Sequence, residues 1–268
     1  MSTAKNKLSK ELEEKLETSS INLVKLDDRK LPTQGHGSGC LLDFGKYRYL
    51  LTVTHNIGDG KKELQVPIKW DVVVTDSVKP IGKELVTLTA GTAFEGMKDP
   101  LDVMEDIDFS YCRYSFDEVP LFNKIDRDTE KVLATRPCTI FSEASVERPE
   151  EGKLYGFAGH TRAAVVKDEL SAEERFLRLS EFRVASNLRF IGEEKTQYGL
   201  QYTFELPLGH PTDDKSFKGC SGTPIVDEQG KVVALVSCGS LSRSRIYGVP
   251  IKNYIAAILV DSLDLLPQ

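Results

Sequence analysis

From Ile21 onward this sequence consists mainly of short apolar runs separated by turn residues, and few folds accommodate that pattern. Runs of this length and spacing are typical of antiparallel barrels. Only residues 1–20, residues 171–178 and about the last fifteen residues have a helical pattern. The runs expected to form strands are 40–44, 47–54, 64–75, 83–89 and 109–114, followed by 138–141, 153–157, 178–185, 199–206, 223–226, 232–237 and 246–250.

The N-terminal residues 1–20 predict a charged amphipathic helix. Leu8, Leu12 and Leu16 are spaced by four residues and therefore share one face. The lysines of this segment are followed at once by glutamates, so the charge is mixed and no basic arm is formed. We expect the apolar face to dock on the body of the protein.

Residues 216–226 read Ser-Phe-Lys-Gly-Cys-Ser-Gly-Thr-Pro-Ile-Val, which predicts a serine held in a tight turn before a strand. The glycines allow the backbone to bend so that the N–H groups of Gly219 and Ser221 converge on one point. Two such donors would form an oxyanion hole, in which each well-placed donor is worth about 3–4 kcal/mol. Ser221 is therefore the candidate nucleophile.

A base and an acid stand upstream in suitable contexts. The apolar run Tyr-Leu-Leu-Thr-Val-Thr ends in His55, which places this imidazole at the end of a strand. Residues 105–112 read Glu-Asp-Ile-Asp-Phe-Ser-Tyr-Cys, so Asp106 and Asp108 are both candidates for the orienting acid. A spacing of two puts them on the same side of a strand. We favour Asp108 because Phe-Ser-Tyr follows it.

The chain order His, Asp, Ser is that of chymotrypsin and differs from that of subtilisins and α/β-hydrolases. From about Gly35 to the C-terminus, the chain resembles trypsin-like (chymotrypsin-fold) serine peptidases of the bacterial, disulfide-free kind. The resemblance implies a serine endopeptidase with the triad His55, Asp108 and Ser221. It would act through an acyl-enzyme intermediate and need no cofactor.

The fold expected on this basis is all-β, with two antiparallel six-stranded β-barrels and the active site between them. Residues 21–120 would form the first barrel and carry the histidine and the aspartate. Residues 121–268 would form the second barrel, carry the serine and end in a closing helix at 250–266.

The resemblance also implies a substrate pocket. Ser237 to Gly239 would form one wall and Gly248 another, while Lys215 would lie at the base with Ser216 beside it. A lysine at the base would favour an acidic substrate residue over a basic one. Alternatively, the loop swings Lys215 into solvent and leaves a small neutral pocket.

Composition narrows the partners. The net charge of −6 argues against nucleic acid, because phosphate binding needs a surplus of Lys and Arg. No apolar run approaches the twenty or so residues that span a bilayer, and residues 1–20 lack the apolar core of a signal peptide. We expect a cytoplasmic protein that acts on protein or peptide substrates, with a regulatory protein as a further partner. No membrane partner is expected.

The five cysteines form no dense framework, so we expect reduced thiols, and their spacing predicts no metal site. Cys220 stands where secreted relatives have the aspartate that pairs with a newly cut N-terminus, so activation by cleavage is not expected. Two alternatives remain open at this point. One is a catalytically silent trypsin-fold binding module, and the other is a cysteine nucleophile, for which Cys220 lies one position too early.

Overall fold

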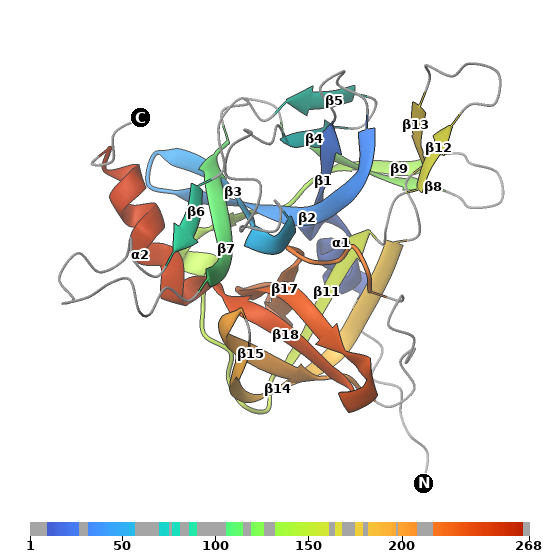
Figure 1. The fold of residues 1–268 in the computed structure, drawn as a ribbon. Coiled ribbons are helices and arrows are strands. Elements are labelled where there is room, and N and C mark those ends of the chain that lie inside the picture. Colours follow the sequence, from blue (N-terminus) through green and yellow to red (C-terminus); the bar gives the residue numbers. More distant parts are fainter. Residues whose placement is uncertain are drawn as a thin grey trace, which may run out of the picture.

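A computed structural model describes most of the chain, and its two helices and many strands are shown in Figure 1. Strands dominate, as the spacing of the apolar runs predicts. The described residues are 10–26, 32–56, 70–74, 77–80, 86–89, 106–114, 119–125, 132–160, 164–167, 175–178, 182–196, 198–207 and 217–264.

The second half of the chain forms a closed antiparallel barrel of six strands in the order β11-β14-β15-β18-β17-β16. Its interior is filled by alternating side chains such as Phe204 and Tyr202 on one strand and Ile225 on another. Closure pairs every strand on both sides, which satisfies the backbone groups that an open edge would expose. The strands are β11 (Leu154–His160), β14 (Phe182–Thr196), β15 (Gly199–Glu205), β16 (Pro224–Asp227), β17 (Val232–Ser240) and β18 (Arg245–Pro250).

The first half forms an eight-stranded sheet whose main path is β5-β4-β1-β2-β3-β7-β6, with β10 paired to β2 in parallel. Both faces of this sheet are buried, since Tyr49 and Leu51 enter one core while Leu50 enters another. The strands are β1 (Ile21–Leu26), β2 (Pro32–Phe44), β3 (Tyr47–Thr52), β4 (Trp70–Val74), β5 (Ser77–Pro80), β6 (Val86–Thr89), β7 (Asp106–Arg113) and β10 (Ile140–Ser142).

The prediction of two six-stranded barrels therefore holds in part. One barrel of six strands closes, whereas in the described residues of the first half β5 and β6 end the sheet without pairing to each other. The sheet also recruits β10, which follows Pro120 in the chain and crosses back to lie beside β2. A second complete barrel remains a prediction, as do the domain boundaries at 120 and 121.

The expected helix at 171–178 is wrong for its described part. Residues Arg175–Arg178 form strand β13, which pairs with β12 (Ala164–Lys167) in an antiparallel hairpin. Ser-Ala-Glu-Glu favours a helix locally, but Phe176 and Leu177 stand opposite the β-branched pair Val165 and Val166. A second small hairpin joins β8 (Leu121–Ile125) to β9 (Val132–Pro137).

Helix α1 (Lys10–Ser19) docks on the second barrel, as its leucine stripe predicts. Leu12 and Leu16 are buried, and Leu16 packs against β11 where Gly156 carries no side chain. Leu8 lies outside the described residues. Docking thus covers the apolar face that an isolated helix would expose.

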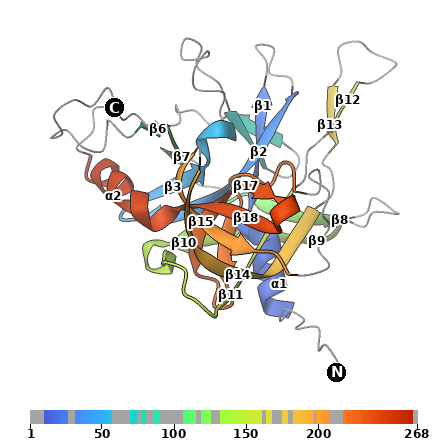
Figure 2. The same cartoon turned by 60° about the horizontal axis from the view of Figure 1, so that its bottom comes forward.

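Helix α2 (Ile251–Ser262) follows the last barrel strand and packs against β17 of the barrel and β2 of the first sheet, and in both views it lies near β3 and β7 (Figure 1, Figure 2). Asp261 accepts hydrogen bonds from Tyr49 and Arg113, one residue from each of these strands. The buried Ile258 joins a core shared by both halves. The C-terminal helix therefore clamps the first sheet to the second barrel.

Neither described helix has the length and apolar character that crossing a membrane requires. No group of three or more His, Cys, Asp or Glu side chains gathers among the described residues in a way that could hold a metal ion.

Candidate active site

His55 lies in a short 3-10 turn (Thr54–Asn56) that follows strand β3. Its Nδ1 lies 2.9 Å from both carboxylate oxygens of Asp108, and its backbone N–H donates to Oδ1 at 3.0 Å. The Thr54 hydroxyl donates to the carbonyl of Ile107 at 2.9 Å and thereby ties the turn to strand β7. Backbone and ring are thus both held against the same carboxylate.

Asp108 stands on β7 and is buried, with a side-chain exposure of 1%. Its carboxylate accepts from His55 and, at 2.6 Å, from the hydroxyl of Ser237 on β17. A buried carboxylate is stable in its charged form only when donors surround it. The competing residue Asp106 begins the same strand, and its side chain lies outside the described residues.

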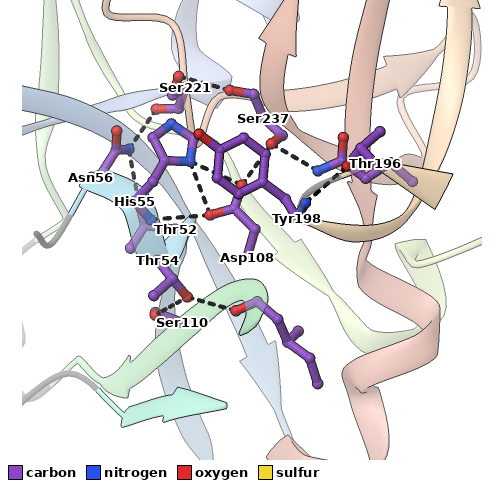
Figure 3. A network of polar contacts seen from close by, with 12 residues as sticks. Thr52, Thr54, His55, Asn56, Asp108, Ser110, Thr196, Tyr198, Ser221 and Ser237 are labelled. Atoms are coloured by element: carbon purple, nitrogen blue, oxygen red, sulfur yellow. Dashed lines mark hydrogen bonds and ion pairs between the residues drawn. The ribbon is translucent and has the colours of Figure 1, made fainter. Parts of the chain in front are cut away.

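Gln201 extends this network into the barrel. Its Nε2 donates to the Ser237 hydroxyl oxygen at 2.8 Å, and both side chains are buried. A hydroxyl has one proton to donate. Because Ser237 accepts from Gln201, its own proton goes to Asp108, as Figure 3 shows for the Ser237 to Asp108 contact. The roles of Ser237 and Gln201 in this network were missed at the sequence level, where Ser237 was assigned to a pocket wall.

Ser221 lies in the turn that precedes β16. Gly219 and Gly222 have φ angles of +105° and +88°, which residues other than glycine rarely adopt. A methyl group on Gly222 would lie 1.8 Å from the carbonyl oxygen of Ser38. Both the backbone angle and the close approach therefore require glycine after the serine.

The first half of the chain holds this turn in place. The backbone N–H of Ser38 donates to the Ser221 carbonyl at 2.8 Å, and the Ser38 hydroxyl donates to the Gly219 carbonyl at 3.1 Å. Asn56, directly after the histidine, also donates to the Ser221 carbonyl at 2.8 Å. The position of Ser221 beside His55 thus depends on contacts between the two halves, which Figure 3 shows for Asn56.

The hydroxyl of Ser221 donates to the backbone carbonyl of Ser237 at 3.0 Å. Within the described part of the chain it makes no hydrogen bond to His55. The N–H groups of Gly219 and Ser221 donate to no backbone carbonyl among the described residues. The Ser221 hydroxyl would have to turn away from Ser237 before it could donate to the imidazole of His55.

The pocket predicted from the sequence is described only in part. Lys215 and Ser216 lie outside the described residues. Gly239 is exposed on β17, whereas Gly248 is buried in β18 against the side chains of Ala234 and Ile225. Barrel packing therefore accounts for Gly248 whatever its relation to a substrate.

The cysteines are all thiols, and Cys220 is fully buried in the barrel core. It therefore points away from the site of Ser221, which argues against it as the nucleophile. Cys238, half-buried on β17, has a pKa raised above its ordinary value, mainly because burial penalises the thiolate.

An aromatic side chain covers the histidine. The ring of Tyr198, from the turn between β14 and β15, stacks on the His55 imidazole with 5.4 Å between centroids and 28° between planes (Figure 3). No local signal in the sequence predicts this contact. It arises because the β14–β15 hairpin of the barrel reaches the histidine of the first sheet.

No protein-family model matches this chain, and no curated protein matches it. The solved structures that it resembles include a serine endoprotease and two further proteases. The serine endoprotease from Yersinia pestis is 14% identical to this chain, with a TM-score of 0.45. The match covers 91% of this chain but only 63% of the Yersinia chain. The MamO protease domain from Magnetospirillum magneticum is 12% identical with a TM-score of 0.48, over 91% and 97% of the two chains. A protease from M. tuberculosis in its active form is 14% identical with a TM-score of 0.47, over 91% and 81%. All three TM-scores lie below 0.5, so the resemblance is distant.

Proposed function

We propose that this protein is a serine endopeptidase that hydrolyses peptide bonds through His55, Asp108 and Ser221. The observation that carries the proposal is the pair formed by His55 Nδ1 and the buried Asp108, 2.9 Å apart, beside a serine in a glycine-bounded turn. A base oriented by a third group, with a hydroxyl nearby, is the arrangement that activates a weak nucleophile. The same arrangement can cleave esters as well as amides, and the substrates proposed here are proteins or peptides.

In the proposed reaction, His55 takes the proton of Ser221 while the serine oxygen attacks the peptide carbonyl. Asp108 keeps the proton of the imidazole on Nδ1 and stabilises the imidazolium. The N–H groups of Gly219 and Ser221 bind the oxyanion. His55 then protonates the leaving amine, and water cleaves the acyl-enzyme by the same steps.

The Ser221 hydroxyl has to rotate for this reaction, because it donates to the Ser237 carbonyl. Catalytic hydrogen bonds are often long or misaligned in a free enzyme and tighten when substrate binds. When the Ser221 hydroxyl turns away from the Ser237 carbonyl, one hydrogen bond worth about 1 kcal/mol is lost, and this cost is small compared with a catalytic barrier. The observed orientation is therefore compatible with a resting enzyme.

A fluorophosphonate probe and a peptide library test the proposal together. The intact protein, verified by mass, should react with the probe at one site and cleave library peptides, without prior trimming of its N-terminus. Ser221→Ala should abolish labelling and lower hydrolysis by several orders of magnitude. Cys220→Ala is the matched control and should keep most of the activity, since that thiol is buried. Unchanged turnover in Ser221→Ala would rule the mechanism out.

A catalytically silent binding module is the second candidate. The observation in its favour is the bond from Ser221 to Ser237, which leaves the nucleophile unpaired with its base. A protein that binds peptides of the library but never reacts with the probe would support this candidate. Labelling of Ser221 would exclude it.

The preference for a substrate residue rests on Lys215 and Ser216. A lysine at the base of the pocket would favour an acidic side chain, while a lysine turned to solvent would leave a small neutral pocket. If acidic peptides are cut, Lys215→Ala should reduce that preference at least about tenfold, or 1.4 kcal/mol. Cleavage after Arg or Lys would contradict both versions.

A further inference from the structure

We propose that Tyr198 determines specificity by limiting the size of the substrate side chain that lies against His55. The inference rests on the proposed peptidase function and adds a substrate class, namely peptides with a small residue at that position. The observation behind it is the stacking of the Tyr198 ring on the imidazole at 5.4 Å and 28°.

The position of Tyr198 is fixed by a tight hairpin. Thr196 and Gly199 stand opposite each other where β14 meets β15. The Thr196 hydroxyl oxygen accepts from the N–H of Tyr198 at 3.1 Å and lies 3.2 Å from the Gly199 carbonyl, to which it donates. Gly199 has a φ of +87°, which closes the turn. The turn therefore presents the ring over His55 from the end of the β14–β15 pair.

The two nitrogen edges of the imidazole face different groups. Its Nδ1 edge faces Asp108, and only 27% of the His55 side chain is exposed. A substrate bound at Ser221 has to bring its leaving nitrogen to the Nε2 edge. The substrate side chain next to the imidazole then competes with the Tyr198 ring for the same space.

The size of the ring sets the expected discrimination. Binding pockets that fit a small side chain reject one or a few extra methylenes by about 10- to 200-fold. Close-packed contacts do not yield to a larger group without displacing a neighbour. Gly, Ala and Ser should be accepted beside Tyr198, whereas Leu and Phe should be rejected.

The test compares the wild type with Tyr198→Phe and Tyr198→Ala. A peptide from the library is altered one residue at a time on each side of the scissile bond, with Ala, Leu or Phe at the altered position. At one position, wild type and Tyr198→Phe should cleave the Ala peptide at least about tenfold better than the Phe peptide, measured as kcat/KM. Tyr198→Ala should remove most of that difference.

Leu200→Ala supplies the matched control. Leu200 lies two residues after Tyr198, on strand β15, with 42% of its surface exposed, so its loss should leave the size preference unchanged. Circular dichroism of each variant verifies that the hairpin change leaves the fold intact. The diagnostic quantity is the ratio of kcat/KM for the Ala peptide to kcat/KM for the Phe peptide, because a purely structural defect would lower kcat/KM for all peptides by the same factor.

The outcomes separate the two proposals. Suppose that the probe labels the wild type, but that the wild type shows no size preference or one that Tyr198→Ala leaves unchanged. This result would overturn the role of Tyr198 alone. An equal loss for all peptides, or labelling that appears only in Tyr198→Ala, would likewise overturn the size limit. A wild type that neither labels nor cleaves would contradict the peptidase function, and the inference would fail with it.

Discussion

The Ser237 hydroxyl donates a 2.6 Å hydrogen bond to Oδ2 of Asp108, although the two residues are 129 positions apart and belong to different halves of the chain. The backbone carbonyl of the same serine accepts the hydroxyl of Ser221. Ser237 therefore contacts both the candidate acid Asp108 and the candidate nucleophile Ser221. Its position links the first sheet to the barrel at the point where catalysis is proposed.

Removing the Ser237 hydroxyl should weaken catalysis while the fold persists. In Ser237→Ala, Asp108 loses a donor in a buried site, and a hydrogen bond to a charged group is worth about 1.5–3 kcal/mol. We expect kcat to fall about 10- to 100-fold in steady-state peptide hydrolysis. Ser242→Ala, on the exposed turn beyond β17, should behave as wild type. An undiminished kcat in Ser237→Ala would remove Ser237 from the positioning network.

Replacing Asp108 by Asn should lower kcat far more than replacing Asp106 by Asn. Asp108→Asn places an amide against His55 Nδ1 and stabilises the wrong imidazole tautomer, which costs about 10⁴ in kcat. Asp106→Asn provides the matched control two residues earlier on the same strand. Rates of peptide hydrolysis for both variants decide the matter, and a larger loss in Asp106→Asn would shift the assignment by two residues.

Alanine at two glycines separates backbone strain from steric conflict. Gly222 and Gly152 have nearly equal φ angles, +88° and +85°, so either substitution should cost about 1–3 kcal/mol of strain. A methyl on Gly152 meets nothing within 4 Å, whereas one on Gly222 would lie 1.8 Å from the Ser38 carbonyl oxygen. The free energy of unfolding, measured in urea, should fall by about 4 kcal/mol or more in Gly222→Ala alone. Equal losses would mean that the Ser38 contact relaxes at no cost.

The C-terminal clamp should weaken in acid. Hydrogen bonds from Lys46, then Arg113 and Tyr47, lower the pKa of Asp264 from 3.8 to about 2. A carboxylate with a lowered pKa contributes its stabilisation above its ordinary value and loses it as the pH falls through the value in the folded protein. The contribution of Asp264 should therefore be complete above about pH 4 and vanish near pH 2.

Asp264→Asn tests this dependence. Asp264 has a φ of +57°, a conformation that Asn tolerates as well as Asp, so the substitution removes charge without adding backbone strain. The wild type should melt at a higher temperature than the variant at neutral pH, and the difference should shrink between about pH 4 and pH 2. A difference that stays constant across this range would contradict the ionic clamp.

Local sequence was sufficient to select the candidate triad. A few neighbouring residues are enough to recognise each candidate: an apolar strand that ends in Thr-His, an aspartate at the start of an aromatic strand, and a serine between glycines. The same holds for the strands and for the leucine stripe of α1, since alternation and helical spacing are short-range patterns. The helix expected at 171–178 shows the limit of such patterns, because pairing with β12 determined its described part.

Only the tertiary structure decided which residues surround the candidate triad. Gln201 reaches Ser237 across the barrel, Asn56 and Ser38 hold the Ser221 turn from the other half, and the β14–β15 turn brings Tyr198 onto His55. These contacts join residues that are 36 to 181 positions apart. They depend on strand register and on the docking of two halves, which no short stretch of sequence encodes. The sequence by itself therefore determined which chemical groups are present and the strand pattern that carries them, and the docking of the sheet on the barrel determined how those groups are oriented, covered and restrained.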